Sequence, residues 1–368
     1  MRVVVAPDSF KGTAEAADVA RAIADGWHDV RPGGDIVTLP MADGGEGTLD
    51  ALAAAPGAVR HAVTVTGPDG RDVEAAWLEL PGAGGPVGVV ELASTSGITL
   101  IEELAALDAH TRGFGEAIAA ALDAGVHSLL LAIGSSCSTD GGAGALAAMG
   151  ARFLDASGEP IADGGRGLAD VTRVDLTELC PLPPGGARVL SDVTSPLTGP
   201  AGAAAVFGPQ KGASPGDVDV LDAALARLAR VAAEAGYEAD PAAPGAGAAG
   251  GTGYGLTLWG ATLGSGAAAV ADAVGLAEAL AAADLVVTGE GAYDGQSDAG
   301  KVVSEVRRRA TAAGIPVALV AGRVDAPTDA FALAASLTGL AGSGEAAMAE
   351  TLRWAREAGA VLARAMSA

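Results

Sequence analysis

Apolar strands followed by glycine-rich loops and helices occur at both ends of this 368-residue chain but not in its middle. Residues 3–6 and 35–40 are short apolar runs that each lead into a loop, and a helix is expected over 13–27. The last third repeats this order, with strands expected at 285–288 and 317–321. Because strand, loop and helix in that order build parallel sheets covered by helices, the chain is predicted to be an α/β protein.

The middle of the chain has a different pattern, which predicts a second domain. From about residue 61, short alternating strands are broken by turns rich in glycine and proline. We therefore expect one domain built from residues 1–62 and 284–368, with residues 63–283 inserted as a second α/β domain. The length agrees with two domains of roughly 150 residues each. Further helices are expected over residues 112–124, 217–235, 267–281, 302–313 and 345–364.

Composition excludes several classes of protein. The net charge of −23, without a basic cluster, argues against nucleic acid and anionic membranes as partners. The most apolar stretch, 267–287, is interrupted by three carboxylates and is not a spanning helix. The N-terminus lacks the apolar core of a secretory signal, and the two cysteines, Cys137 and Cys180, form no CxxC pair. These features predict a cytoplasmic protein.

The rarest polar residues gather in glycine-rich loops. The chain has no asparagine, and its only lysines and glutamines are Lys11, Lys211, Lys301, Gln210 and Gln296. Surface lysines without a function are expected on exposed helix faces rather than in such loops. A lysine ammonium acts as a point charge on phosphate. The pattern therefore favours an anion site.

Two glycine motifs give different indications. Gly295-x-x-x-x-Gly300-Lys301 follows a strand and opens a helix, as a Walker A loop does, although Val302 stands where Ser or Thr would bind Mg²⁺. Phosphate or carboxylate binding is expected there, with a structural turn as the alternative. Residues 245–250 match GxGxxG but follow prolines rather than a strand, which argues against dinucleotide binding.

Carboxylates follow the predicted strands of the sheet. In open α/β sheets, ligands bind beyond the carboxyl ends of the strands, where carboxylates hold Mg²⁺ or accept a hydroxyl proton. Any one of them could instead cap a helix or form a turn. Together they predict a metal-assisted anion site, and they are Asp8, Asp43, Glu46, Asp140, Asp192, Glu290 and Asp294.

The segment Gly134–Gly142 follows a strand with hydroxyl and small side chains. It fails the GxSxG pattern of a nucleophile elbow, and no histidine lies in a comparable loop. A nest of backbone N–H groups around an anion fits this segment better. Cys137 is expected to be a small packed residue.

Several loops together resemble the type-1 glycerate kinase family, and the resemblance spans nearly the whole chain. It rests on residues 6–12, 40–48, 206–213, 244–251 and 288–291. It implies phosphorylation of D-glycerate by ATP with Mg²⁺, with 2-phosphoglycerate the favoured product. It also implies a flavodoxin-like parallel-sheet domain formed from both chain ends, an inserted second α/β domain and a site in a cleft. A homodimer is left open.

The chain departs from the pattern of that family at three positions. Ser135 replaces a glycine, Thr139 replaces an asparagine, and Ala292 replaces an arginine. Loss of a guanidinium beside an anion site is expected to weaken phosphate or carboxylate binding or to shift the choice of substrate.

A hypothesis for the site follows from the resemblance and the loop chemistry. Lys11, Lys211 and Lys301 contact phosphate or carboxylate. Asp192, with Asp43 as the alternative, accepts the glycerate hydroxyl proton or orders Mg²⁺. Glu290, Asp294 and Glu46 are the metal candidates. The expected substrate-binding residues are Asp8, Ser9, Ser136, Asp140, Gln210, Gly289, Gln296 and Ser297.

Two other functions remain open at this stage. The chain could phosphorylate a different small hydroxy acid, as the loss of arginine at Ala292 allows, or be a non-catalytic ligand-binding regulator on the same fold. A dinucleotide oxidoreductase is a third, weaker candidate because the GxGxxG match is misplaced.

Overall fold

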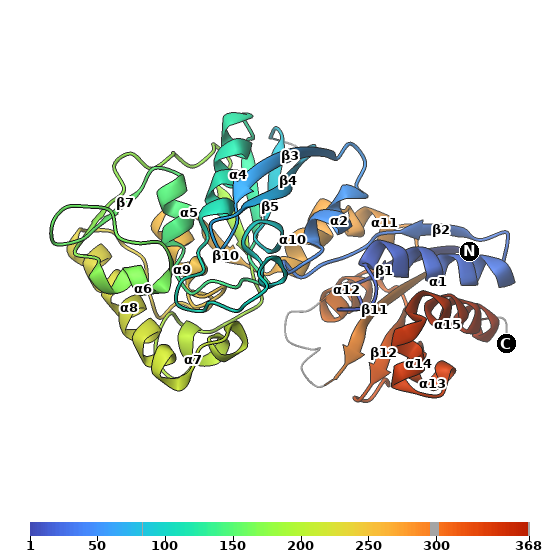
Figure 1. The fold of residues 1–368 in the computed structure, drawn as a ribbon. Coiled ribbons are helices and arrows are strands. Elements are labelled where there is room, and N and C mark those ends of the chain that lie inside the picture. Colours follow the sequence, from blue (N-terminus) through green and yellow to red (C-terminus); the bar gives the residue numbers. More distant parts are fainter. Residues whose placement is uncertain (83, 295–301, 367–368) are drawn as a thin grey trace. The chain divides into compact units, whose positions relative to one another are not determined.

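The computed structural model describes residues 1–82, 84–294 and 302–366 (Figure 1). The chain divides into two compact units. Unit 1 comprises residues 1–43, 50–56 and 265–368, and unit 2 comprises residues 44–49 and 57–264.

Unit 1 is built on a sheet of five parallel strands in the order β13-β12-β11-β1-β2. Numbered along the unit, this order is 2-1-3-4-5, which is that of the flavodoxin-like fold. The predicted parallel-sheet domain from both chain ends is therefore confirmed. The strands are β1 (Arg2–Pro7), β2 (Asp35–Thr38), β11 (Leu285–Tyr293), β12 (Val317–Val324) and β13 (Leu333–Ser336).

The central strands of this sheet are buried on both faces. Val3–Val5 in β1 and Leu285–Val287 in β11 have no exposed surface, as expected for parallel strands covered by helices. On one face α1 (Ala16–Val30) and α15 (Thr351–Ala365) pack together over alternate strand side chains. A β-carbon at Gly359 would lie 2.1 Å from the Ile23 carbonyl oxygen, so only glycine permits this close approach. Helix α12 (Val302–Ala313) also packs on these strands.

Unit 2 contains a mixed sheet in the order β10-β9-β6-β5-β4-β3, in which the first four strands are parallel and the last two antiparallel. A separate antiparallel pair joins β7 to β8. The strands are β3 (Val59–Thr66), β4 (Asp72–Leu80), β5 (Val87–Glu91), β6 (Ser128–Ala132), β7 (Arg152–Leu154), β8 (Arg173–Asp175), β9 (Ala187–Leu190) and β10 (Thr262–Gly264).

The remaining helices cover these sheets and connect their strands. They are α2 (Thr48–Ala53), α3 (Ala93–Ser96), α4 (Arg112–Asp123), α5 (Ala143–Ala148), α6 (Gly164–Gly167), α7 (Ala203–Phe207), α8 (Pro215–Glu234), α9 (Thr252–Leu258), α10 (Gly266–Ala273), α11 (Leu276–Leu280), α13 (Leu337–Ala341) and α14 (Gly344–Ala349), with 3₁₀ turns η1 (Ile98–Leu100), η2 (Leu168–Asp170) and η3 (Pro209–Lys211). Among the described residues, no helix has both the length and the apolar character needed to cross a membrane.

Two helices expected from the sequence are each broken in two. The helix expected over 267–281 is α10 and α11, separated at Gly275, whose φ of +72° ends the first helical segment. The helix expected over 345–364 is α14 and α15, separated at Glu350, whose backbone leaves the helical region. Periodicity alone did not reveal either break.

The boundary of the units differs from the one expected at residue 284. Helices α10 and α11 belong to unit 1. Arg309 of α12 explains this assignment, because it forms an ion pair with Asp272 at 2.7 Å and donates to the Ala268 carbonyl at 3.0 Å. These contacts hold α10 against the terminal unit.

Candidate active site

A pocket of about 440 Å³ lies in unit 1 at the carboxyl ends of β1, β11 and β12. The order of the strands reverses between β1 and β11, and ligands of doubly wound sheets bind at such a point. Six residues predicted for the site line one end of this pocket: Asp8, Ser9, Lys11, Asp43, Glu290 and Asp294. As expected from their positions after parallel strands, these residues lie around one pocket although they are far apart in the sequence.

The backbone of the sheet positions these side chains. The Asp8 N–H donates to the Gly289 carbonyl at 2.8 Å, which extends the pairing of β1 with β11 up to the pocket. The Met41 N–H donates to the Pro7 carbonyl at 2.9 Å and keeps the loop that carries Asp43 beside β1. A β-carbon at Gly289 would lie 1.9 Å from the Val320 carbonyl oxygen. Gly289, predicted to bind substrate, thus has a packing role between β11 and β12.

The polar end of this pocket holds carboxylates close together. The pKa of Asp8 is raised from 3.8 to about 7, first by burial and then by the neighbouring Asp43 and Glu290 carboxylates, while the Ser9 N–H and Lys11 act in the opposite direction. Lys11 is largely exposed, and its Nζ lies 3.6 Å from Asp43 Oδ2. The Asp43 carboxylate raises the pKa of Lys11, so the ammonium stays charged.

The other end of the pocket is mostly apolar. Leu337, Ala347 and Met348 from α13 and α14 line it together with the hydroxyls of Thr338 and Thr351. One end thus carries charges and the other offers apolar contact with two hydroxyl groups. An elongated ligand with a charged and an apolar part matches this division.

A second pocket, of about 330 Å³, lies in unit 2. It is lined by the loop after β6, which carries Ser135 and Ser136, and by Ser191 after β9. Since β6 and β9 are parallel neighbours, their carboxyl ends meet at one edge of the sheet. Gln210 and Lys211, both predicted for the site, complete the polar lining.

Lys211 is the distinctive group of this second pocket. Only 2% of the residue is exposed, and its Nζ donates to Ser136 Oγ at 2.8 Å and to the Ser138 carbonyl. Burial lowers the pKa of Lys211 to about 8. The buried Asp140 carboxylate acts on this ammonium electrostatically and raises its pKa, but among the described residues no carboxylate forms a direct ion pair with it. An anion entering the pocket would therefore be its direct charged partner.

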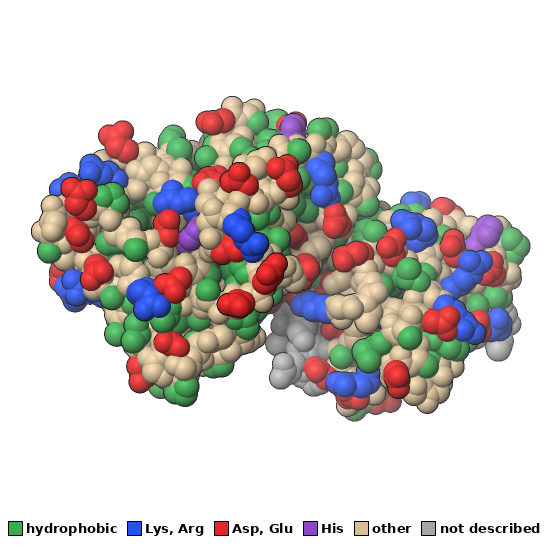
Figure 2. All heavy atoms as spheres, viewed as in Figure 1, with side chains coloured by type: hydrophobic (Ala, Val, Ile, Leu, Met, Phe, Trp, Pro, Cys, Tyr) green, Lys and Arg blue, Asp and Glu red, His purple; other side chains and the backbone are tan. Residues whose placement is uncertain are grey.

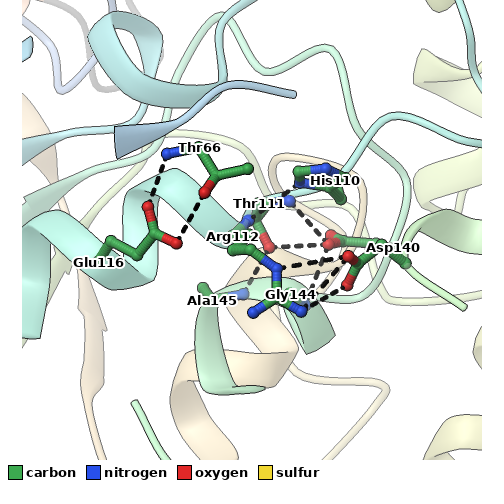
Figure 3. A network of polar contacts seen from close by, with 9 residues as sticks. Thr66, His110, Thr111, Arg112, Glu116, Asp140, Gly144 and Ala145 are labelled. Carbon is green, nitrogen blue, oxygen red and sulfur yellow. Dashed lines mark hydrogen bonds and ion pairs between the residues drawn. The ribbon is translucent and has the colours of Figure 1, made fainter. Parts of the chain in front are cut away.

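Asp140 has a different place from the one expected. It is fully buried and accepts hydrogen bonds from Thr111 N and Oγ1 and from the Gly144 N–H (Figure 3). The Gly142 N–H also donates to it. Thr111 Oγ1 in turn accepts from the Ala145 N–H at 2.9 Å. This network fixes the loop after β6 to the starts of α4 and α5. Asp140 thus holds the loop that carries the partners of the buried lysine.

The remaining predicted residues fall in three places. Asp192 is half-buried just beyond β9, between Ser191 and Val193, which both line the second pocket. Glu46 is exposed, belongs to unit 2 and is not among the residues that line the pocket of unit 1. Gln296, Ser297 and Lys301 lie outside the described residues.

Two further sequence expectations concern packing. Cys137 is buried, its thiol donates to the Ser96 carbonyl, and burial raises its pKa to about 12, so it is an inert packed residue as expected. The GxGxxG segment is also packed: a β-carbon at Gly250 would lie 2.1 Å from the Ser138 carbonyl oxygen. Gly250 therefore leaves room for the carbonyl that Lys211 binds.

The family model "Glycerate kinase family" matches residues 3–367 of this chain. The chain belongs to the glycerate kinase family. It is 39% identical over 334 residues to a glycerate kinase of Bacillus subtilis, covering 90% of this chain and 87% of the relative. It is 40% identical over 327 residues to the glycerate 2-kinase of Escherichia coli, covering 88% and 85%. The predicted family and its class of enzyme, a phosphotransferase, are confirmed.

A solved structure agrees with the fold of this glycerate kinase. The crystal structure of putative glycerate kinase 2 from Salmonella typhimurium superposes with a TM-score of 0.86 at 38% identity, covering 100% of this chain and 98% of that one. The two α/β units are thus shared with a relative.

Some lining residues of this glycerate kinase were missed in the sequence. Ser191 follows β9 and directly precedes the candidate Asp192, so the rule on strand ends could have found it. Thr338, Met348 and Thr351 gave no signal, because they lie in helices of ordinary pattern. Arg323 follows the strand expected at 317–321 and also lines the pocket, but the strand-end pattern concerned carboxylates and lysines and so did not indicate an arginine.

Proposed function

We propose that this protein transfers the γ-phosphoryl group of ATP to the 2-hydroxyl of D-glycerate, with Mg²⁺ as the required cation. Membership of the glycerate kinase family supports glycerate and ATP as substrates. The 2-hydroxyl is favoured because one relative is named glycerate 2-kinase. The observation that carries the proposal is the buried ammonium of Lys211, which lies beside Ser136 in a pocket suited to a small carboxylate and forms no direct ion pair in the described part of the chain.

The unit 1 pocket is the proposed nucleotide site. Its charged end suits the phosphates, with Lys11 as the cation that contacts them, and its apolar end at Leu337, Ala347 and Met348 suits the base. Phosphoryl transfer depends on positioning and charge neutralisation more than on covalent chemistry, so a lysine at this position contributes directly.

The residues of this pocket fit Mg²⁺. Asp43 and Glu290 raise the pKa of Asp8, so negative charge is concentrated there beyond what Lys11 offsets. Among the described residues, no group of three or more acidic, histidine or cysteine side chains could hold a metal ion by itself. Mg²⁺ commonly takes only one or two carboxylates together with substrate phosphates and water, which Glu290 with Asp294 or Asp8 would supply. When bound, the cation would neutralise charge on the phosphates.

The unit 2 pocket is the proposed glycerate site. Lys211 would bind the carboxylate, and Ser136 would orient the substrate through its hydroxyl. Asp192, in the loop between Ser191 and Val193, is the proposed acceptor of the proton from the attacking hydroxyl. Asp43 is the less suitable base, because its carboxylate already pairs with Lys11.

Proton-coupled phosphorus NMR of the protein with D-glycerate and Mg-ATP tests the proposal. Phosphate on the 2-hydroxyl is attached to a CH carbon and gives a doublet, whereas phosphate on the 3-hydroxyl is attached to a CH₂ carbon and gives a triplet. A new doublet that requires both substrates, the protein and Mg²⁺ is the expected result. A triplet would refute the 2-hydroxyl, and intact ATP with a folded protein would refute glycerate as the substrate.

A matched pair of variants tests the assignment of the glycerate site. Lys211→Met removes the ammonium with little change of volume and is expected to raise KM for D-glycerate at least tenfold. Arg227→Met is the control, since this residue of unit 2 donates to the Val171 carbonyl and lines neither pocket. Equal effects of the two changes would refute a specific role for Lys211.

A further inference from the structure

We propose that Arg323 supplies the second cation of the nucleotide pocket and binds a phosphate of Mg-ATP. The inference rests on the proposed binding of ATP in unit 1. It assigns a binding role to a residue at the end of β12 that the sequence did not single out.

The register of the sheet places Arg323 beside Ala292, a residue with a small side chain. Ala292 of β11 and Arg323 of β12 are direct partners in the parallel ladder, and both line the pocket. Register partners lie on the same face of a sheet, on strands about 4.8 Å apart. Glu290 is two residues before Ala292 and shares that face. Arg323 is thus on the same face as the Glu290 carboxylate.

The neighbours of Arg323 are small. Ala292 presents only a methyl group, and Gly291 and Gly322 present none. A β-carbon at Gly322 would lie 2.4 Å from the Gly291 carbonyl oxygen, so the packing of the two strands keeps this position bare. Among the described residues, the neighbours of Arg323 on the two strands therefore leave room for its long side chain beside Ala292.

Asp325 orients the guanidinium of Arg323. Arg323 Nε forms a short ion pair with Asp325 Oδ2, and the Asp325 N–H donates to the Tyr293 carbonyl at 2.8 Å. The carboxylate is thus fixed to the end of β11. The pair engages Nε, and in the described part of the chain Arg323 forms no other ion pair. With 63% of the side chain exposed, the terminal nitrogens remain accessible to a ligand.

The excess of negative charge in the pocket favours a second cation for binding phosphate. Among its described lining residues, four carboxylates stand against two cations, Lys11 and Arg323. Lys11 already pairs with Asp43. A guanidinium presents a planar fork of N–H donors that binds phosphate through two hydrogen bonds, which a lysine does not reproduce. Arg323 is therefore the group best suited to hold a phosphate oxygen.

Steady-state kinetics at saturating D-glycerate test the inference. Arg323→Gln is expected to raise KM for Mg-ATP about tenfold or more and to leave KM for D-glycerate unchanged, since a charge-assisted hydrogen bond is lost. Arg323→Lys is expected to recover only part of the loss. The control is Arg364→Gln, an exposed arginine on α15 that pairs with Glu357 and does not line the pocket. It is expected to change neither constant by more than about twofold.

Moving the guanidinium between the strands gives a sharper test. In the Arg323→Gln background, Ala292→Arg is expected to restore most of the affinity for Mg-ATP, because the two positions are neighbours on one face. An unchanged KM for Mg-ATP in Arg323→Gln, or a rise in KM for D-glycerate instead, would overturn the inference.

The inference can fail separately from the proposed function. If the wild-type protein makes no phosphoglycerate, the proposed function fails, and calorimetric titration with Mg-ATP then tests Arg323 on its own. A tenfold weaker Kd in Arg323→Gln, with a wild-type Kd in Arg364→Gln, would support the inference. Equal Kd values in the three proteins would overturn it.

Discussion

Replacing Asp8 by asparagine should stabilise the protein at neutral pH. The Asp8 residue is 8% exposed, and its raised pKa reflects both burial and the Asp43 and Glu290 carboxylates. Asparagine has nearly the same volume and keeps an oxygen to accept the Ser9 N–H, which lies 2.7 Å from Asp8 Oδ1. The substitution thus removes the charge and little else.

The size of the effect depends on pH. Below about pH 3.8 the carboxyl is protonated in both the folded and the unfolded chain, so the favourable contribution of its raised pKa is fully present. As pH rises toward 7, the unfolded chain releases the proton and the folded chain keeps it, which lowers the free energy of unfolding by about 1.4 kcal/mol per pH unit. Above the folded pKa, the contribution is lost. Asp8→Asn should therefore gain about 1.5 kcal/mol over wild type at pH 5 and about 4 kcal/mol at pH 8.

Urea unfolding at pH 5, 6, 7 and 8 in the absence of metal ions measures this difference. The control is Asp18→Asn, which removes one negative charge from an exposed side chain of α1 in the same unit. A difference between Asp8→Asn and wild type that stays constant with pH would refute the reasoning. Added Mg²⁺ should narrow the difference at pH 8, because the cation stabilises the ionised carboxylate. Activity should fall at the same time, since stability and function oppose each other at this position.

Three substitutions test other features of the structure. Ser135→Gly should raise the free energy of unfolding by about 1 kcal/mol in urea, because Ser135 has a φ of +59° in the left-handed region. Gly359→Ala should lower it by about 2–3 kcal/mol, since the added β-carbon meets the Ile23 carbonyl oxygen. Relative to Lys211→Met, wild type should gain up to about 3 kcal/mol between pH 8 and 10.5, as the buried ammonium of the folded chain loses its proton before that of the unfolded chain.

The sequence was sufficient for the sheet of unit 1 and for one end of its pocket. Apolar runs such as residues 3–6 and 285–288 predict strands buried on both faces, because few other structures hide every side chain of such a run. Once the strands are parallel, their carboxyl ends coincide, so Asp8 and Glu290 had to meet although 281 residues lie between them. Here local pattern and topology determine the site together.

The sequence could not separate a carboxylate of the site from one of the framework. Asp8 and Asp140 both follow apolar strands in loops with small residues. Asp140 belongs to the framework because N–H and hydroxyl donors of Thr111 and Gly144 surround its carboxylate. Thr111 comes from another segment of the chain, which reaches Asp140 only through tertiary packing. A pattern in one strand and loop carries no information about donors supplied from elsewhere in the fold.

On the face shown in Figure 2, acidic and basic side chains are interspersed. A chain of net charge −23 must reverse its field locally if it binds the two proposed anionic substrates. The two pockets suggest different solutions. Lys211 is a buried cation whose desolvation outweighs the effect of the Asp140 carboxylate, since its pKa is lowered, and this is costly until an anion arrives. Asp8 and its neighbours concentrate negative charge, which is costly until a cation arrives. In each pocket, buried charge lowers the stability of the folded protein, and the proposed ligand carries the opposite charge. Ligand binding is therefore expected to raise the free energy of unfolding at both pockets.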